Sequence, residues 1–324
     1  MNQMLGTVPR VSDVLRDLVD AVDAYAIAVQ GATTGREILG SEGSSEIVAE
    51  GRLRWRFERE PVRSAHSMIR MGHFFILDSY RSLARLSATE PPSVYGPFVL
   101  ARSLLDTAGW VFWLTELGIG ADRRVQRSIA LRIAEGDEQN PPKRPEFKSV
   151  RARIEKDLEN AERFCAHHEW NVHSRGQRHN LRIGSESLPS RRRLIDEVIG
   201  VDQATVEKEF GSTLWWFLSG FTHGGMYGLV HAVQGNPDPD PLTGNAAIYV
   251  RADDFVWLLV ACGRAAIATT QRRMELFGDS TDGTQDKQLE LEEQFARYLG
   301  AVRIGQLPAG HNAAAGGRKR LPST

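Results

Sequence analysis

Two pairs of polar residues, each separated by four positions, are the strongest candidates for chemistry in this sequence. Arg102 and Asp106 form one pair, and Ser219 and His223 form the other. Side chains four residues apart lie on the same face of a helix, so the members of each pair can meet. If the two helices cross in the fold, Asp106 could orient the imidazole of His223 while Arg102 binds an anion such as phosphate.

A structural explanation competes with this chemistry for Ser219 and His223. Glycines recur at every fourth position from Gly220 to Gly228, and such a row lets another backbone approach closely or lets the helix bend. The pair could therefore be a buried hydrogen bond beside a tight helix crossing. A site histidine in a pocket is the alternative, because a buried imidazole can be tuned across neutral pH.

Arg102 and Asp106 have a structural alternative of their own. They lie at the edge of an apolar stripe in their helix, where they could form an ordinary intrahelical ion pair. Such a pair contributes roughly 0.3–0.5 kcal/mol when it is exposed. A catalytic site requires Arg102 and His223 side by side in an open cleft, whereas a structural network requires both to be buried and fully paired.

A basic stretch and a group of histidines follow in the middle of the chain. Between Arg175 and Arg193 there are six arginines and a single acid, Glu186. This charge suits RNA or another anionic partner, although Trp170 is the nearest aromatic side chain for base stacking, and a solvated surface loop is the alternative. The nearby potential metal ligands are Cys165, His167, His168, His173 and His179. Their spacing matches no standard zinc pattern, so we predict no metal site.

Helical periodicity dominates the rest of the sequence. Helices are expected over 11–30, 62–86, 95–117, 122–135, 147–168, 207–233, 253–277 and 287–299. Residues 31–45 are rich in Gly, Thr and Ser and are expected to form a loop, and no useful strand pattern occurs. The apolar stripe of the 62–86 helix is expected to include Met68, Met71 and Phe75, and the aromatic run 215–217 is expected in the core.

These elements define the predicted architecture. The fold class is all-α, a multi-helix bundle with long antiparallel helices and a disordered C-terminal tail. We predict an N-terminal helical segment over 1–60, the main helical bundle over 61–305 and the disordered tail over 306–324.

Composition limits the classes of protein to which the chain can belong. With 41% hydrophobic and 25% charged residues it is a folded globular protein, and a net charge of −1 argues against general nucleic-acid binding. Two cysteines favour a reducing compartment, residues 1–10 lack signal-peptide features, and no apolar run approaches the roughly 20 residues that span a bilayer. We therefore expect a cytoplasmic protein with no membrane contact. Phosphate loops, dinucleotide fingerprints and nucleophile elbows are absent, so no cofactor is predicted.

Two motifs carry a resemblance to known proteins. Residues 101–108, with the sequence Ala-Arg-Ser-Leu-Leu-Asp-Thr-Ala, and residues 218–224, Leu-Ser-Gly-Phe-Thr-His-Gly, resemble an uncharacterised family of helical proteins common in actinobacteria. Its members carry an Arg-Ser-Leu-Leu-Glu-like helix and a later Ser-Gly-x-x-His-Gly segment. The resemblance covers roughly residues 60–300 and departs at Asp106, where the family usually has Glu. It implies a fold and two motifs but no activity.

A looser resemblance is to the HEPN (higher eukaryotes and prokaryotes nucleotide-binding) helical proteins. Several of these are RNases or partners in toxin and phage-defence systems, with an Arg four to six residues before a His in one helix. This chain has no Arg between Phe210 and His223. An RNase of this type would therefore need Arg102 from another helix.

Three functional hypotheses follow. The leading one is a module without classical catalysis, at most conditionally catalytic, that binds a protein partner or small ligand near Arg102, Asp106, Ser219 and His223. The second is an RNA-cleaving or nucleotide-binding protein, in which His223 is the general base and Arg102 steadies the phosphate. The third is a homo-oligomer subunit, which would expose a broad apolar face on the final helices, residues 253–299.

Overall fold

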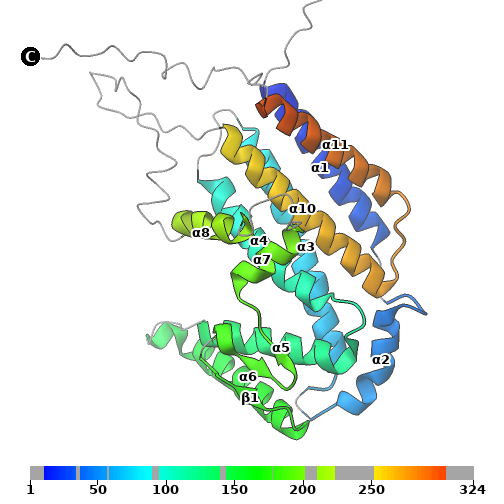
Figure 1. Ribbon diagram of the computed structural model, residues 1–324. Coiled ribbons are helices and arrows are strands. Elements are labelled where there is room, and N and C mark those ends of the chain that lie inside the picture. The colour runs from blue at the N-terminus through cyan, green and yellow to red at the C-terminus, as the bar shows by residue number, and fades with distance from the viewer. Residues whose placement is uncertain are drawn as a thin grey trace, which may run out of the picture.

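A computed structural model describes residues 11–33, 37–56, 58–89, 95–138, 144–176, 178–200, 210–222 and 252–303. In these residues the chain forms a bundle of long helices with one small three-stranded sheet (Figure 1). The all-α prediction is thus confirmed. The segment predicted to be a disordered tail, 306–324, lies outside the described residues.

The described elements follow one another along the chain. They are α1 (Val11–Ala32), α2 (Glu42–Leu53), α3 (Pro61–Ser87), α4 (Gly96–Leu114), α5 (Gly120–Glu138), η1 (Pro145–Phe147), α6 (Lys148–His167), β1 (Val172–His173), η2 (Arg178–Asn180), β2 (Arg182–Ile183), β3 (Glu186–Ser187), α7 (Arg191–Ile199), α8 (Phe210–Thr222), α10 (Ala252–Phe277) and α11 (Thr284–Arg303). No described helix is long and apolar enough to cross a membrane.

The centre of the bundle is α3, which packs against α4, α1, α10 and α2. The first and last helices, α1 and α11, lie side by side along one edge (Figure 1). Leu18 of α1 and Leu291 of α11 belong to the same buried core as Ile76 of α3. The N-terminal helix therefore shares the core of the main bundle.

Two glycines allow α4 to approach its neighbours closely. A Cβ atom on Gly72 of α3 would lie 2.5 Å from Cγ2 of Val111 and would overlap the ring of Trp110. A Cβ atom on Gly109 of α4 would lie 2.9 Å from Cβ of Leu194 in α7. Because glycine has no Cβ, α3 and α7 can both pack tightly on α4. This packing fixes the surface on which Arg102 and Asp106 stand.

Two segments expected to be irregular are ordered. The prediction of a loop over 31–45 was wrong at its C-terminal end, because α2 begins at Glu42. The side chain of Ser41 caps this helix by accepting a hydrogen bond from the backbone N–H of Ser44. The beginning of the basic stretch and the residues just before it form an antiparallel sheet, with Val172 opposite Ile183 and Arg182 opposite Ser187. Strands of two residues are too short to show alternation in a sequence.

The expected apolar stripe of α3 was wrong in part. Ile69 and Ile76 are buried as a core stripe requires, whereas Met71, Phe74 and Phe75 are exposed by 65%, 61% and 42%. Apolar residues occupy both sides of this helix, so the spacing of Met71 and Phe75 indicated a shared face but not which face is buried.

Candidate functional site

The first predicted pair, Arg102 and Asp106, meets as its spacing predicts. Nη1 of Arg102 donates a hydrogen bond to Oδ1 of Asp106 at 2.8 Å within α4. The arginine side chain is only 6% exposed and the carboxylate 27%. The pair is therefore more than a solvated surface ion pair, and one side of the carboxylate still faces solvent.

Trp215 of α8 joins this pair. Its indole Nε1 donates to Oδ1 of Asp106 at 3.3 Å, and the guanidinium carbon of Arg102 lies 4.2 Å from the centre of its ring. Arg102 thus has a cation–π contact in addition to its ion pair. The expectation that the whole aromatic run lies in the core was wrong for Trp216, which is 54% exposed.

The second predicted pair is only partly described. The hydroxyl of Ser219 donates to the backbone carbonyl of Trp215 at 2.9 Å, within its own helix. His223 lies outside the described residues, one position beyond the end of α8. The described contacts therefore join Arg102 and Asp106 through Trp215, and the role of His223 stays a prediction.

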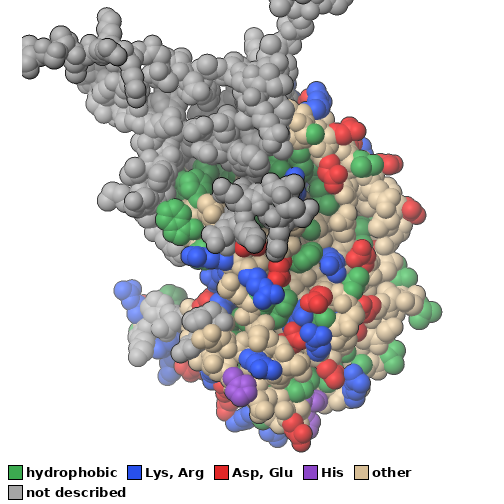
Figure 2. Space-filling model, in the orientation of Figure 1, with side chains coloured by type: hydrophobic (Ala, Val, Ile, Leu, Met, Phe, Trp, Pro, Cys, Tyr) green, Lys and Arg blue, Asp and Glu red, His purple; other side chains and the backbone are tan. Residues whose placement is uncertain are grey.

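Three further arginines lie near Asp106 or Trp215. The guanidinium carbon of Arg192 lies 5.2 Å from the centre of the Trp215 ring. Arg191 and Arg178 are close enough for their charges to act on the Asp106 carboxylate. We call the group formed by Arg102, Arg178, Arg191, Arg192, Asp106 and Trp215 the arginine cluster. Figure 2 shows basic side chains gathered on the surface just below α8, beside its apolar side chains.

Burial has opposite effects on the two charges at the centre of the cluster. It raises the pKa of Asp106, and the opposing effects of Arg102 and Arg191 are smaller. It lowers the pKa of Arg102, because removal from water disfavours the charged form, while Asp106 opposes this shift.

Three arginines of the basic stretch form ion pairs with acids of α5 and α6. Arg175 donates to Asp137 and to Glu162, and both Arg178 and Arg191 donate to Glu138. The Nε atom of Arg178 is nevertheless buried without a hydrogen-bond partner in the described part of the chain. These ion pairs hold the stretch against the bundle, and one buried donor of Arg178 is left without a partner among the described residues.

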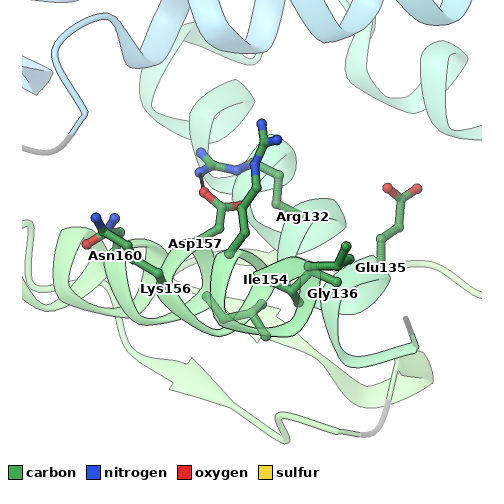
Figure 3. Close-up of a pocket in the computed structure, with 10 residues that line it drawn as sticks. Arg132, Glu135, Gly136, Ile154, Lys156, Asp157 and Asn160 are labelled. Carbon is green, nitrogen blue, oxygen red and sulfur yellow. Dashed lines mark hydrogen bonds and ion pairs between the residues drawn. The ribbon is translucent and has the colours of Figure 1, made fainter. Parts of the chain in front are cut away.

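A pocket of about 570 Å³ opens between α5 and α6. Its walls are Arg132, Glu135, Gly136, Val150, Arg153, Ile154, Lys156, Asp157, Leu158 and Asn160. Figure 3 shows Arg132 and Asp157 pointing toward one another, while Glu135 projects away from them. Nη2 of Arg132 donates a hydrogen bond to Oδ1 of Asp157 at 2.8 Å. Arg178 and Arg191 act electrostatically on Glu135, so this residue links the pocket to the cluster.

A second polar cluster was not anticipated from the sequence. His66 is fully buried, with Nδ1 2.9 Å from Oε1 of Glu37 and Nε2 2.9 Å from Oε2 of Glu46. Arg124 is also fully buried and donates to Glu46 at 2.7 Å and to Glu42 at 2.8 Å. We call Glu37, Glu42, Glu46, His66, Arg70 and Arg124 the α2 network. The missed signal was the recurrence of Glu at 42, 46 and 50, which places three carboxylates on one helix face.

The α2 network is held by mutual hydrogen bonds, although Nε of Arg70 is buried without a partner among the described residues. Each ring nitrogen of His66 lies 2.9 Å from a carboxylate oxygen, Nδ1 from Glu37 and Nε2 from Glu46. The hydrogen bond from His66, aided by Arg70, lowers the pKa of Glu37 to about 2. Burial would raise the pKa of Glu46, but hydrogen bonds from His66 and Arg124 lower it overall.

The histidines near Cys165 make aromatic contacts. The ring of His167 stacks on Trp55 at 5.9 Å and that of His168 on Trp170 at 5.1 Å, and Cys165 is buried. Within the described residues no three His, Cys, Asp or Glu side chains gather as metal ligands would. The side chain of His179 lies outside the description.

Comparison with known proteins adds no relative. No family model matches the chain, and no curated protein or solved structure does so. The resemblance to the actinobacterial family and to HEPN proteins therefore stays a prediction.

Proposed function

We propose that this protein is a cytoplasmic module that binds a small anionic ligand, bearing a phosphate or carboxylate, at the arginine cluster and does not catalyse a reaction. The observation that carries the proposal is the gathering of four guanidinium groups around the half-buried Asp106 and Trp215. Guanidinium groups suit such ligands because their donors match the oxygens of phosphates and carboxylates.

Within the proposal, the arginines divide into two roles. Arg102 is held by Asp106 and Trp215, so it shapes the site and contributes positive charge. Arg178 and Arg191 share a single carboxylate, Glu138, and Arg178 keeps a buried donor without a partner. The guanidinium groups of these two arginines would donate hydrogen bonds to the ligand. Ser219 and His223, on or beyond α8, would complete the neighbouring wall.

Binding of phosphate and pyrophosphate tests the proposal directly. Isothermal titration calorimetry of the wild-type protein should give saturable binding of at least one of these probes. Arg191→Gln should remove it, since the substitution deletes a charge that faces the ligand. Arg193→Gln is the matched control, because Arg193 lies in the same turn but pairs with Glu197 at the surface. Absence of saturable binding by the folded wild-type protein, for both probes, contradicts the proposal.

An RNA-cleaving protein is the alternative function. The observation that favours it is the position of the same arginines beside α8, which ends one residue before His223. In this case Arg102 would steady a phosphate while His223 acts as the general base. Loss of cleavage of a cellular RNA pool in both His223→Ala and Arg102→Ala would support it. Lack of cleavage by the wild-type protein would leave the binding proposal.

A further inference from the structure

An exposed apolar surface lies in the middle of α3, away from the arginine cluster's partners α7 and α8. Met71, Phe74 and Phe75 are exposed by 65%, 61% and 42% and fall within five consecutive residues. Large apolar side chains exposed singly are ordinary, whereas a contiguous group indicates a contact surface. We call these three residues, with Ile27 of α1, the α3 patch.

The α3 patch extends sideways onto both neighbouring helices. Asp23 of α1 accepts hydrogen bonds from Arg81 at 2.7 Å and Arg85 at 2.6 Å, so its face of α1 adjoins α3. Ile27 follows one helical turn later on that face and is 60% exposed. On the other side, Trp110 of α4 packs over Gly72 and is half-buried.

Side-chain size and charge differ between the two ends of this face of α3, so the face is complementary to an antiparallel copy of itself. Small side chains, Ser64 and Ser67, precede the patch, and the bulky Phe74 lies within it. Arg63 stands at the beginning of this face, and Asp78 stands at its end. Asp78 is exposed and has no hydrogen bond among the described residues, whereas Arg63 pairs only with the exposed Glu60 at the surface. In an antiparallel pair of these helices, the small serines of one copy would face the bulky Phe74 of the other. Arg63 of one copy would face Asp78 of the other.

We propose that a second copy of this chain covers the α3 patch in a two-fold symmetric dimer, with the two α3 helices antiparallel and Met71 near the axis. Phe74 and Phe75 of each copy then pack over Ser64 and Ser67 of the other. A two-fold interface uses the same surface twice, which is what this complementarity requires. The dimer is independent of ligand binding at the arginine cluster.

This surface differs from the one expected on the final helices. In the described part of α10 and α11, Leu289 is the large apolar side chain that stands exposed. A single such residue gives no broad apolar face. The dimer contact is therefore assigned to α3, and Leu289 offers a matched control.

Sedimentation velocity of the full chain over a range of concentrations tests the dimer. The wild-type protein should dimerise, and Phe74→Glu should weaken dimerisation by about tenfold or more, as expected for a central aromatic contact. Leu289→Glu, an equally exposed position on α11, should leave it unchanged. A wild-type protein that is monomeric at all concentrations overturns the proposal, and so does a dimer that Phe74→Glu does not weaken.

Cross-linking and charge reversal test the antiparallel arrangement. Met71→Cys should form a disulfide with its own copy under oxidation, whereas Val48→Cys, 86% exposed on α2, should not; the native Cys165 and Cys262 are buried. Arg63→Asp and Asp78→Arg should each weaken the dimer, and the double variant should recover it. Failure of Met71→Cys to cross-link faster than Val48→Cys overturns the placement of the axis, and failure of the double variant to recover overturns the pairing.

Discussion

The arginine cluster and the α2 network use the same kinds of side chain but differ in charge balance and access. In the α2 network, Arg124 and His66 are fully buried and each of them contacts two carboxylates. In the arginine cluster, Arg102 pairs with Asp106 while Arg178 and Arg191 share Glu138, and the carboxylate of Asp106 is partly open to solvent. A closed, balanced network holds elements together, whereas an open cluster with excess charge can take a ligand.

The elements that each region joins reinforce this contrast. The α2 network ties α2 and the segment around Glu37 to α3 and α5, through pairs separated by 20 or more residues in the chain. The arginine cluster lies where α4, α7 and α8 meet, and its pair Arg102–Asp106 is local to one helix. We expect the first region to dominate stability and the second to dominate binding.

The largest effect is expected on removal of Arg124. Arg124→Met leaves Glu42 and Glu46 without their buried cation and should lower the free energy of unfolding by about 3–5 kcal/mol. Urea denaturation followed by circular dichroism measures it. Arg163→Met, which removes an exposed pair with Glu159, is the control and should change stability by about 0.5 kcal/mol or less. Similar small losses in both variants would contradict a structural role for the network.

Removal of Arg102 should cost less than removal of Arg124. Arg102→Met deletes the bond to Asp106 and the contact with Trp215, but the partly open carboxylate can be hydrated. We expect a loss of about 1–2 kcal/mol, measured by the same denaturation. A loss as large as that of Arg124→Met would show that the arginine cluster is as closed as the α2 network.

Acidification should weaken the α2 network through Glu37. Its folded pKa of about 2 lies below the ordinary value of 4.5, so the ionised form stabilises the fold above that value. This stabilisation, at most about 1 kcal/mol because Glu37 partly faces solvent, is lost as the pH falls from 4.5 toward 2. Denaturation at several pH values should show a flatter dependence for Glu37→Gln. An unchanged dependence would mean that Glu37 does not take part. For Asp106 the pH dependence of stability has the opposite sign. Its pKa is raised in the folded protein, so protonation of this carboxylate at low pH favours the fold.

The smallest effect on stability, and the sharpest test of the comparison, is expected at Arg178. Its bond to Glu138 is long, 3.5 Å, and its Nε has no partner in the described chain. Arg178→Gln should change the free energy of unfolding by about 0.5 kcal/mol or less, yet weaken phosphate or pyrophosphate binding. Paired denaturation and calorimetry measure both quantities. A variant that is destabilised but still binds would assign Arg178 to the fold rather than to the ligand.

Local patterns in the sequence were sufficient for much of the fold. The helix predicted over 62–86 is α3, Pro61–Ser87, and that over 253–277 is α10, Ala252–Phe277. The contact between Arg102 and Asp106 also followed from spacing, because residues four apart meet in any helix. These properties depend on backbone geometry over one or two turns, which the order of residues determines by itself.

Tertiary structure decided the features that depend on distant partners. The helix α2 is rich in Ser and Gly, and its carboxylates are buried only because His66 and Arg124 come from α3 and α5. Trp215 reaches Asp106 from more than 100 residues away, and no local pattern announces that contact. The exposure of Met71 and Phe75 has the same origin. Spacing tells which side chains share a face, but the free energy of burial depends on which other elements cover that face, and that is known only when the whole chain is packed.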